Sequence, residues 1–122
     1  MASTTLGFLW LAGCSSQTAG GANLSLTNAT SETTTISVTI SDRTNEETLL
    51  DESYEVPASD DGILIEDVIT RSGEYNVEAA VENTDERTES LWRIPSDVNP
   101  KNYSIRVGLS YDQTLNIHGD GV

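Results

Sequence analysis

Apolar and polar residues alternate along most of the chain after residue 22, in short runs separated by turn-forming residues. In the clearest run, Thr34 to Ser41, every second residue (Ile36, Val38 and Ile40) is branched and apolar, and the residues between are Ser or Thr. Successive side chains of a β-strand point to opposite faces, so this pattern predicts a strand with one buried and one solvated face. Such strands are typical of antiparallel sheets.

Seven further runs of this kind give eight predicted strands and no predicted helix. They lie at residues 24–26, 48–56, 63–69, 75–81, 90–94, 103–109 and 115–117. The predicted turns between them include residues 27–32, 57–62 and 83–87, and all three prolines (Pro57, Pro95 and Pro100) fall outside the runs, as expected for strand boundaries. We therefore predict an all-β domain, a two-sheet antiparallel β-sandwich of about seven or eight strands, with a small barrel as the alternative.

One motif narrows the type of sandwich. Gly73, Tyr75 and Val77 form a Gly-x-Tyr-x-Val pattern that resembles the corner where a strand enters an immunoglobulin-like domain, with the tyrosine hydroxyl bonded back to nearby backbone. Antibody-type domains carry cysteine at the position of Val77. Trp92, further along, is predicted to face the core. The span 24–94 resembles the fibronectin-III-like and adhesion-associated immunoglobulin-like modules of prokaryotic surface proteins, which implies an immunoglobulin-like fold.

The segment Leu11-Ala12-Gly13-Cys14 resembles a lipobox, the processing site of prokaryotic lipoproteins. It follows an apolar run, and Cys14 is the sole cysteine of the chain. The resemblance implies a chain cleaved before Cys14, with a lipid attached to its thiol. The apolar segment is too short to span a bilayer as a helix.

The predicted organisation follows from this site. Residues 1–13 are a signal-peptide remnant, residues 14–21 a lipid-anchored flexible tether rich in Ser and Gly, and residues 22–122 the sandwich. Because Met1 to Thr5 carries no Lys or Arg, we expect the start of the signal to lie upstream.

The net charge of the chain predicts a strongly acidic surface. The chain has 20 Asp and Glu against 6 Lys and Arg, for a net charge of −14, and its acidic residues are spread along its length. A folded, lysine-poor acidic domain resembles haloarchaeal-type proteins, in which high salt screens the self-repulsion. Nucleic acids and anionic lipid surfaces, which need a basic face, are not expected as partners.

Three Asn-x-Ser/Thr sequons are candidate glycosylation sites in an exported chain. They begin at Asn23, Asn28 and Asn102. Asn28 is the first choice, because it lies in a predicted turn.

The remaining titratable residues predict no active site. Asp60 and Asp61 precede Gly62 and are weak candidates for calcium ligands, against the simpler interpretation of a solvated acidic loop. His118 is the sole histidine and is expected to face outward on the last strand. No nucleophile, base and orienting group occur in a recognisable pattern, and no cofactor is predicted.

These features predict a non-enzymatic, lipid-anchored module on the outer face of the cytoplasmic membrane of a halophile, with a binding or structural role in the envelope. Its expected partners are the membrane, through Cys14, and other envelope proteins. The alternative is an accessory or ligand-presenting subunit of a transport system, which needs a concave site with convergent polar groups. A small hydrolase is a third interpretation without a supporting motif.

Overall fold

The computed structural model of the protein describes residues 20–120, so Cys14 and the predicted signal segment lie outside the described residues. The described part contains eight strands and one short 3-10 helix, η2. Their bounds are β1 Ala22–Asn28, β2 Thr34–Asp42, β3 Glu47–Val56, β4 Ser59–Ile69, β5 Gly73–Val81, β6 Arg87–Ile94, η2 Pro100–Asn102, β7 Ser104–Leu109 and β8 Leu115–Asp120. Within this part of the chain, no helix is long and apolar enough to cross a membrane.

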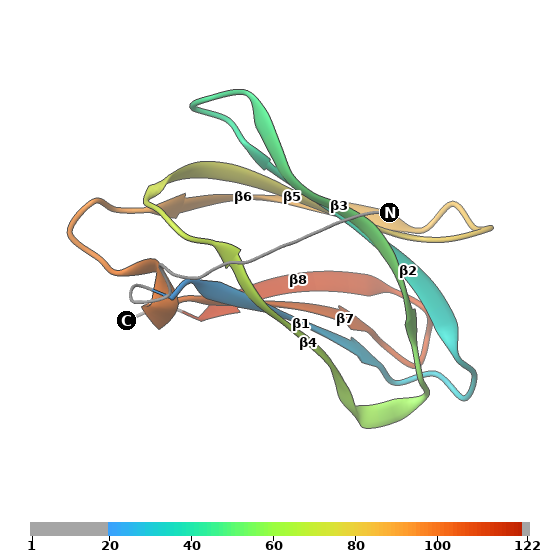
Figure 1. Cartoon of the computed structure of the whole chain (residues 1–122). Helices are drawn as coiled ribbons and strands as arrows, with labels where there is room; N and C mark the ends of the chain where they lie inside the picture. The colour runs from blue at the N-terminus through green and yellow to red at the C-terminus, as the bar shows by residue number, and fades with distance from the viewer. Residues whose placement is uncertain (1–19, 121–122) are drawn as a thin grey trace, which may run out of the picture.

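The strands form two four-stranded sheets packed face to face, which confirms the predicted sandwich (Figure 1). One sheet has the order β4-β1-β7-β8 and the other β3-β2-β5-β6. The pairings are antiparallel except that β1 and β7 run parallel. This exception arises because β6 ends at the same end of the sandwich at which β1 begins, so the chain re-enters the first sheet from that end and β7 runs in the direction of β1.

The predicted alternation explains the core. Ile36, Val38 and Ile40 of β2 are fully buried, while the Ser and Thr residues between them are partly exposed. Leu24 and Leu26 of β1 are buried against them from the facing sheet. Burial of these inward sets holds the two layers together, since apolar surface removed from water is the main stabilising contribution in such a domain.

The predicted tyrosine corner is confirmed, and the sandwich is immunoglobulin-like. The chain crosses from β4 to β5, and the buried Tyr75 hydroxyl donates a hydrogen bond to the backbone oxygen of Arg71 (2.5 Å). Burial raises the pKa of Tyr75, so the hydroxyl keeps the proton that it donates. Gly73 has φ +147°, a conformation that favours glycine, and Val77 is fully buried two residues beyond the tyrosine.

Trp92 is half-buried rather than fully enclosed. It lies at the edge between the sheets and packs against the core. A Cβ atom added to Gly119 of β8 would lie 1.3 Å from the Trp92 ring. Gly119 is therefore the position that lets this ring close one side of the sandwich.

Two predicted turns are placed differently in the structure. The turn predicted over 57–62 is wrong beyond Ala58, because β4 begins at Ser59. Gly62 has φ +69° and lies against β1, where an added Cβ would be 2.2 Å from the Leu26 oxygen. It permits an irregularity within the strand, where the register with β1 shifts. The first predicted turn starts too early, since β1 continues to Asn28.

Successive strands reverse direction, so the loops gather at two ends of the molecule (Figure 1). We call the end where β1 begins the proximal end; it contains loops 43–46, 70–72 and 95–103. The opposite, distal end contains loops 29–33, 57–58, 82–86 and 110–114. The nine-residue β2 connects the two ends and spans about 30 Å at its usual rise per residue.

Candidate functional site

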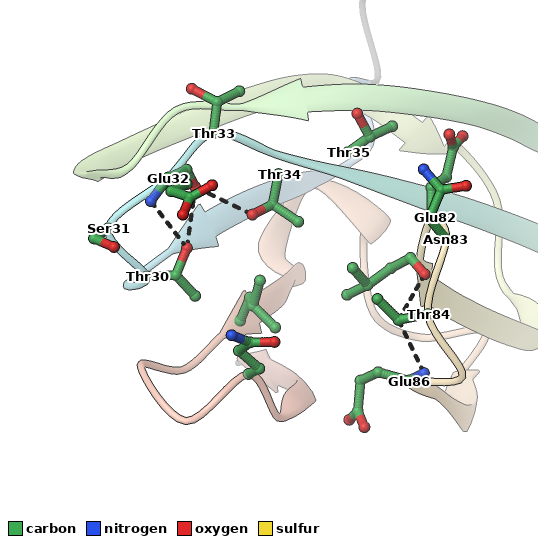
Figure 2. Close-up of a pocket in the computed structure, with 13 residues that line it drawn as sticks. Thr30, Ser31, Glu32, Thr33, Thr34, Thr35, Glu82, Asn83, Thr84 and Glu86 are labelled. Carbon is green, nitrogen blue, oxygen red and sulfur yellow. Dashed lines mark hydrogen bonds between the residues drawn. The ribbon is translucent and has the colours of Figure 1, made fainter.

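A hollow of about 400 Å³ opens at the distal end, between the loop that follows β1 and the loop that follows β5 (Figure 2). It is lined by Thr30–Thr35, Val81–Thr84, Glu86, Leu109 and Gln113. In Figure 2, Thr30 to Thr34 form one wall and Glu82 to Glu86 the other, and the Thr34 side chain lies between them. Three separate loops therefore contribute to one concave surface.

Asn28 positions the first wall. Its side chain is 1% exposed, and Nδ2 donates to the backbone oxygens of Glu32 (2.8 Å) and Val56 (3.0 Å). Its Oδ1 accepts from the backbone N–H of Thr30 (2.9 Å). A buried amide with these partners fixes loop 29–33 against β3, because releasing the bond to Val56 would leave polar atoms unpaired away from water.

The second wall is tied to the neighbouring sheet. The Thr84 hydroxyl donates to the Val81 oxygen (2.9 Å) and accepts from the backbone N–H of Glu86 (3.1 Å). The Glu86 carboxylate accepts from the backbone N–H of Leu115 (2.8 Å), the first residue of β8. Asn83, at the tip, has φ +65°. These bonds hold loop 82–86 beside loop 110–114.

The third loop, 110–114, contributes Gln113 to the hollow. Gln113 has φ +67°, and its backbone N–H donates to the Ser110 oxygen (2.8 Å). The Ser110 hydroxyl donates to Asp112 (2.5 Å), and this bond is the main cause that lowers the pKa of Asp112. Tyr111, between them, is 84% exposed. The loop is thus held by its own hydrogen bonds and leaves an aromatic ring in solvent.

The lining of the hollow combines many neutral hydrogen-bonding groups with a few acidic and apolar side chains. Hydroxyls and side-chain amides dominate it, together with three glutamates, and Val81 and Leu109 are its apolar members. No lysine, arginine or histidine is among its residues. Among the described hydrogen bonds, the side chains of Glu32, Asn83 and Gln113 have no partner. The two amides are available to a ligand as donors and acceptors, and the Glu32 carboxylate as an acceptor.

A second polar cluster, at the proximal end, is structural. The Asp42 side chain is 2% exposed and lies 3.2 Å from the Arg71 guanidinium, which also contacts Glu47 at 3.0 Å. Asp42 accepts from the Asn45 side chain (2.9 Å) and from the backbone N–H of Thr44 (2.9 Å). The Asn45 side-chain bond is the largest of several hydrogen bonds that lower the pKa of Asp42, against the opposing effect of burial. This carboxylate is fully engaged in holding loop 43–46.

The asparagines of the three sequons differ in how accessible they are in the structure. Asn28 is not in an exposed turn, so the reason for ranking it first is wrong; its Nδ2, the atom that would carry a glycan, is buried and bonded to two carbonyls. Asn23 is half-buried and accepts from the backbone N–H of Asp67 (3.1 Å). Asn102 is exposed at the end of η2. Glycosylation stays a prediction, and Asn102 is now its most accessible site.

The other predicted residues do not come together. Asp61 is exposed on β4, and the side chain of Asp60 lies outside what the structure describes. His118 is exposed on β8, opposite Arg106. In residues 20–120, no three His, Cys, Asp or Glu side chains are grouped as metal ligands would be.

Sequence reasoning missed the hollow, although a signal for it was present. In a chain whose strands reverse at every turn, the first, third, fifth and seventh turns share one end. Three of these four turns, the first, fifth and seventh along the chain, supply Asn83, Gln113 and the other lining residues of the loops.

The chain matches no protein family and no curated protein sequence. The immunoglobulin-like architecture rests on the sandwich and the tyrosine corner. A fold of this kind supports many functions.

Proposed function

We propose that the protein is a non-enzymatic binding module of a halophile cell surface, held to the outer face of the membrane by a lipid on Cys14. The observation that carries this proposal is the topology. The described chain enters the sandwich at the proximal end, and the hollow lies at the distal end. A lipid on Cys14 therefore leaves the distal loops as the part of the domain that faces outward.

The entry point of the chain is well fixed. The backbone N–H of Gly21 donates to Asp67 of β4 (2.8 Å), and an added Cβ at Gly21 would lie 2.5 Å from the Ile69 oxygen. The proposed tether thus ends where the backbone is already packed against β4. Only the residues from Cys14 to this point separate the lipid from the domain.

Charge supports the same orientation. The distal loops contain five carboxylates and no lysine or arginine: Glu32, Glu82, Asp85, Glu86 and Asp112. The proximal loops contain Arg43, Arg71 and Lys101 with two carboxylates, Glu46 and Asp97. On close approach an anionic lipid surface therefore repels the distal end more strongly than the proximal end, an effect that molar salt restricts to about 3 Å.

A binding role fits the use of the buried polar side chains. The two that the core contains, Asn28 and Asp42, each hold a loop in place, as described above. Side-chain amides without a described partner, those of Asn83 and Gln113, lie at the surface of the distal hollow. This hollow also fits the second candidate, a subunit that presents a ligand to a transporter, because both roles need a concave polar site.

The anchor is tested with Cys14→Ser in the full chain, expressed in a halophilic host with Ser16→Ala as the matched control. We expect the Cys14→Ser chain to leave the detergent phase after phase separation, while the Ser16→Ala chain stays in it. One acyl chain binds a membrane only marginally, so the difference is largest if the anchor carries two. Retention of the Cys14→Ser chain in the detergent phase would overturn the proposal.

Orientation is tested by labelling intact cells with a bulky maleimide that does not cross membranes. The two reporters are Asp85→Cys in the distal loop 82–86 and Asn102→Cys at the proximal end; both native residues are exposed. We expect the distal thiol to react faster. Equal rates, or a faster proximal thiol, would contradict an outward-facing distal end.

A further inference from the structure

The lining of the distal hollow restricts the chemistry of its ligand. Three glutamates and no cationic residue line it, so phosphate, sulfate and carboxylate ligands meet repulsion without a compensating charge. Its hydroxyls and amides are neutral groups that both donate and accept hydrogen bonds. A ligand that matches them is uncharged and carries many hydroxyl or amide groups of its own.

Two lining residues adopt a backbone conformation that most residues avoid. Asn83 and Gln113 have φ +65° and +67°, in the left-handed region that glycine enters without cost. At both positions the loop nevertheless carries a side-chain amide that lines the hollow and that no described residue engages. Asparagine enters this region more readily than other non-glycine residues, so the backbone conformation accounts for Asn83, but it does not account for Gln113.

An exposed aromatic ring is carried by the same loop as one of these amides, outside the residues that line the hollow. Tyr111 lies two residues before Gln113 on the same loop and is 84% exposed. The hollow also has Val81 and Leu109 among its lining residues. A pyranose ring combines an apolar C–H face with an edge of hydroxyls, so it could pack on the aromatic ring and bond to the amides at once.

We infer that the distal hollow binds a neutral carbohydrate, with Asn83 and Gln113 bonding to its hydroxyls and Tyr111 packing on a sugar ring. A volume of about 400 Å³ is at the small end for ligand pockets and suits one or two sugar units of a longer glycan. The inference rests on the proposed role as a surface binding module, and it names the ligand class of that module.

The test is titration of the full chain with four neutral probes: maltotetraose, cellotetraose, mannotetraose and chitotetraose. Binding is followed by saturation-transfer NMR and calorimetry, in low and in molar potassium chloride. We expect at least one probe to bind, with an affinity that changes little with salt, because screening acts on charged partners. Binding of none of the four would overturn the inference.

Asn83→Gly and Gln113→Gly make the test independent of folding. Glycine suits both backbone conformations, so each variant should keep or raise the melting temperature. Each should weaken the affinity by about tenfold, since the hydrogen bonds of one amide are lost. Affinity unchanged in both variants would place the sugar elsewhere and contradict the inference.

Tyr111→Ala tests the packing contact, with Leu64→Ala as its control. Leu64 is also exposed (59%), but it lies on β4. We expect the tyrosine variant alone to lose affinity. Equal losses would reject a role for Tyr111. Membrane attachment through Cys14 does not depend on any of these residues, so failure of sugar binding with intact anchoring would reject this inference and leave the proposed anchor standing.

Discussion

The two ends of the sandwich solve the same structural problem with different chemistry. At each end one buried polar side chain holds the loop next to it: Asn28 at the distal end and Asp42 at the proximal end. Asn28 uses a neutral amide and bonds mainly to backbone. Asp42 uses a carboxylate and recruits Arg71, which reaches on to Glu47. Both ion pairs found in residues 20–120 belong to this proximal cluster.

The difference separates an end that is held by ion pairs from the end at which we propose that a ligand binds. Near the proximal cluster, Tyr75 bonds to the backbone of Arg71, so the corner and the ion pairs share one residue. At the distal end, Asn28 holds loop 29–33, and on the two neighbouring loops the amides of Asn83 and Gln113 have no described partners beside the hollow. A loop held from beneath by a buried amide can present its outer side chains to a ligand without rearranging.

Replacing the distal amide should have the largest effect on stability. Asn28→Ala leaves the buried Val56 oxygen without this donor and removes a buried amide that makes three further hydrogen bonds, whereas the Glu32 oxygen keeps the Thr30 and Thr34 hydroxyls. We therefore expect a loss of about 3 kcal/mol in the free energy of unfolding. Urea denaturation in high salt measures it, with the exposed Asn102→Ala as the control, which should change little. Amide exchange should rise first in loop 29–33. A loss as small as that of the control would show that Asn28 does not hold the distal end.

The sequence predicted the fold better than it predicted the site. Alternation at Ile36, Val38 and Ile40 identified a strand because burial of one face requires it, and the spacing of Gly73 and Tyr75 identified the corner because the hydrogen bond there is local. Pairing of β1 with β7 could not be predicted, since it joins segments about 80 residues apart.

The role of Asn28 was hidden for a different reason. Asparagine next to polar residues is typical of an exposed turn, and only the position of β3 shows that its amide is covered and bonded to Val56. The turn predicted at Gly62 was wrong for a similar reason. Glycine with a positive φ serves a turn or a strand irregularity equally well, and the choice between them depends on how closely β1 approaches.

Removing the corner hydroxyl should have an intermediate effect. Tyr75→Phe keeps the buried ring but leaves the Arg71 oxygen without its donor, and we expect a loss of about 1 to 2 kcal/mol. Tyr103→Phe is the matched control, because Tyr103 is half-buried against the core and no described hydrogen bond involves its hydroxyl. Urea denaturation of both variants checks the difference. Equal losses would mean that the hydroxyl adds nothing to the proximal end beyond the packing of its ring.

The smallest expected effect is a difference between the two ends in how the stability of the domain depends on pH. Hydrogen bonds lower the pKa of Asp42 in the folded protein, so its stabilising contribution is present above the ordinary aspartate pKa of about 3.9 and is lost as pH falls through the lowered value. Asp42→Asn lacks this contribution. We therefore expect a variant that melts several degrees below wild type near neutral pH, with this difference in melting temperature, the gap, narrowing in acid.

Asp112→Asn at the distal end is the control: its pKa is also lowered, but Asp112 is exposed, so its gap should be smaller throughout. Melting curves of the three proteins across the acid range, at constant high salt, measure both gaps. A gap for Asp42→Asn that stays constant with pH would show that the carboxylate holds the proximal end by shape and not by charge.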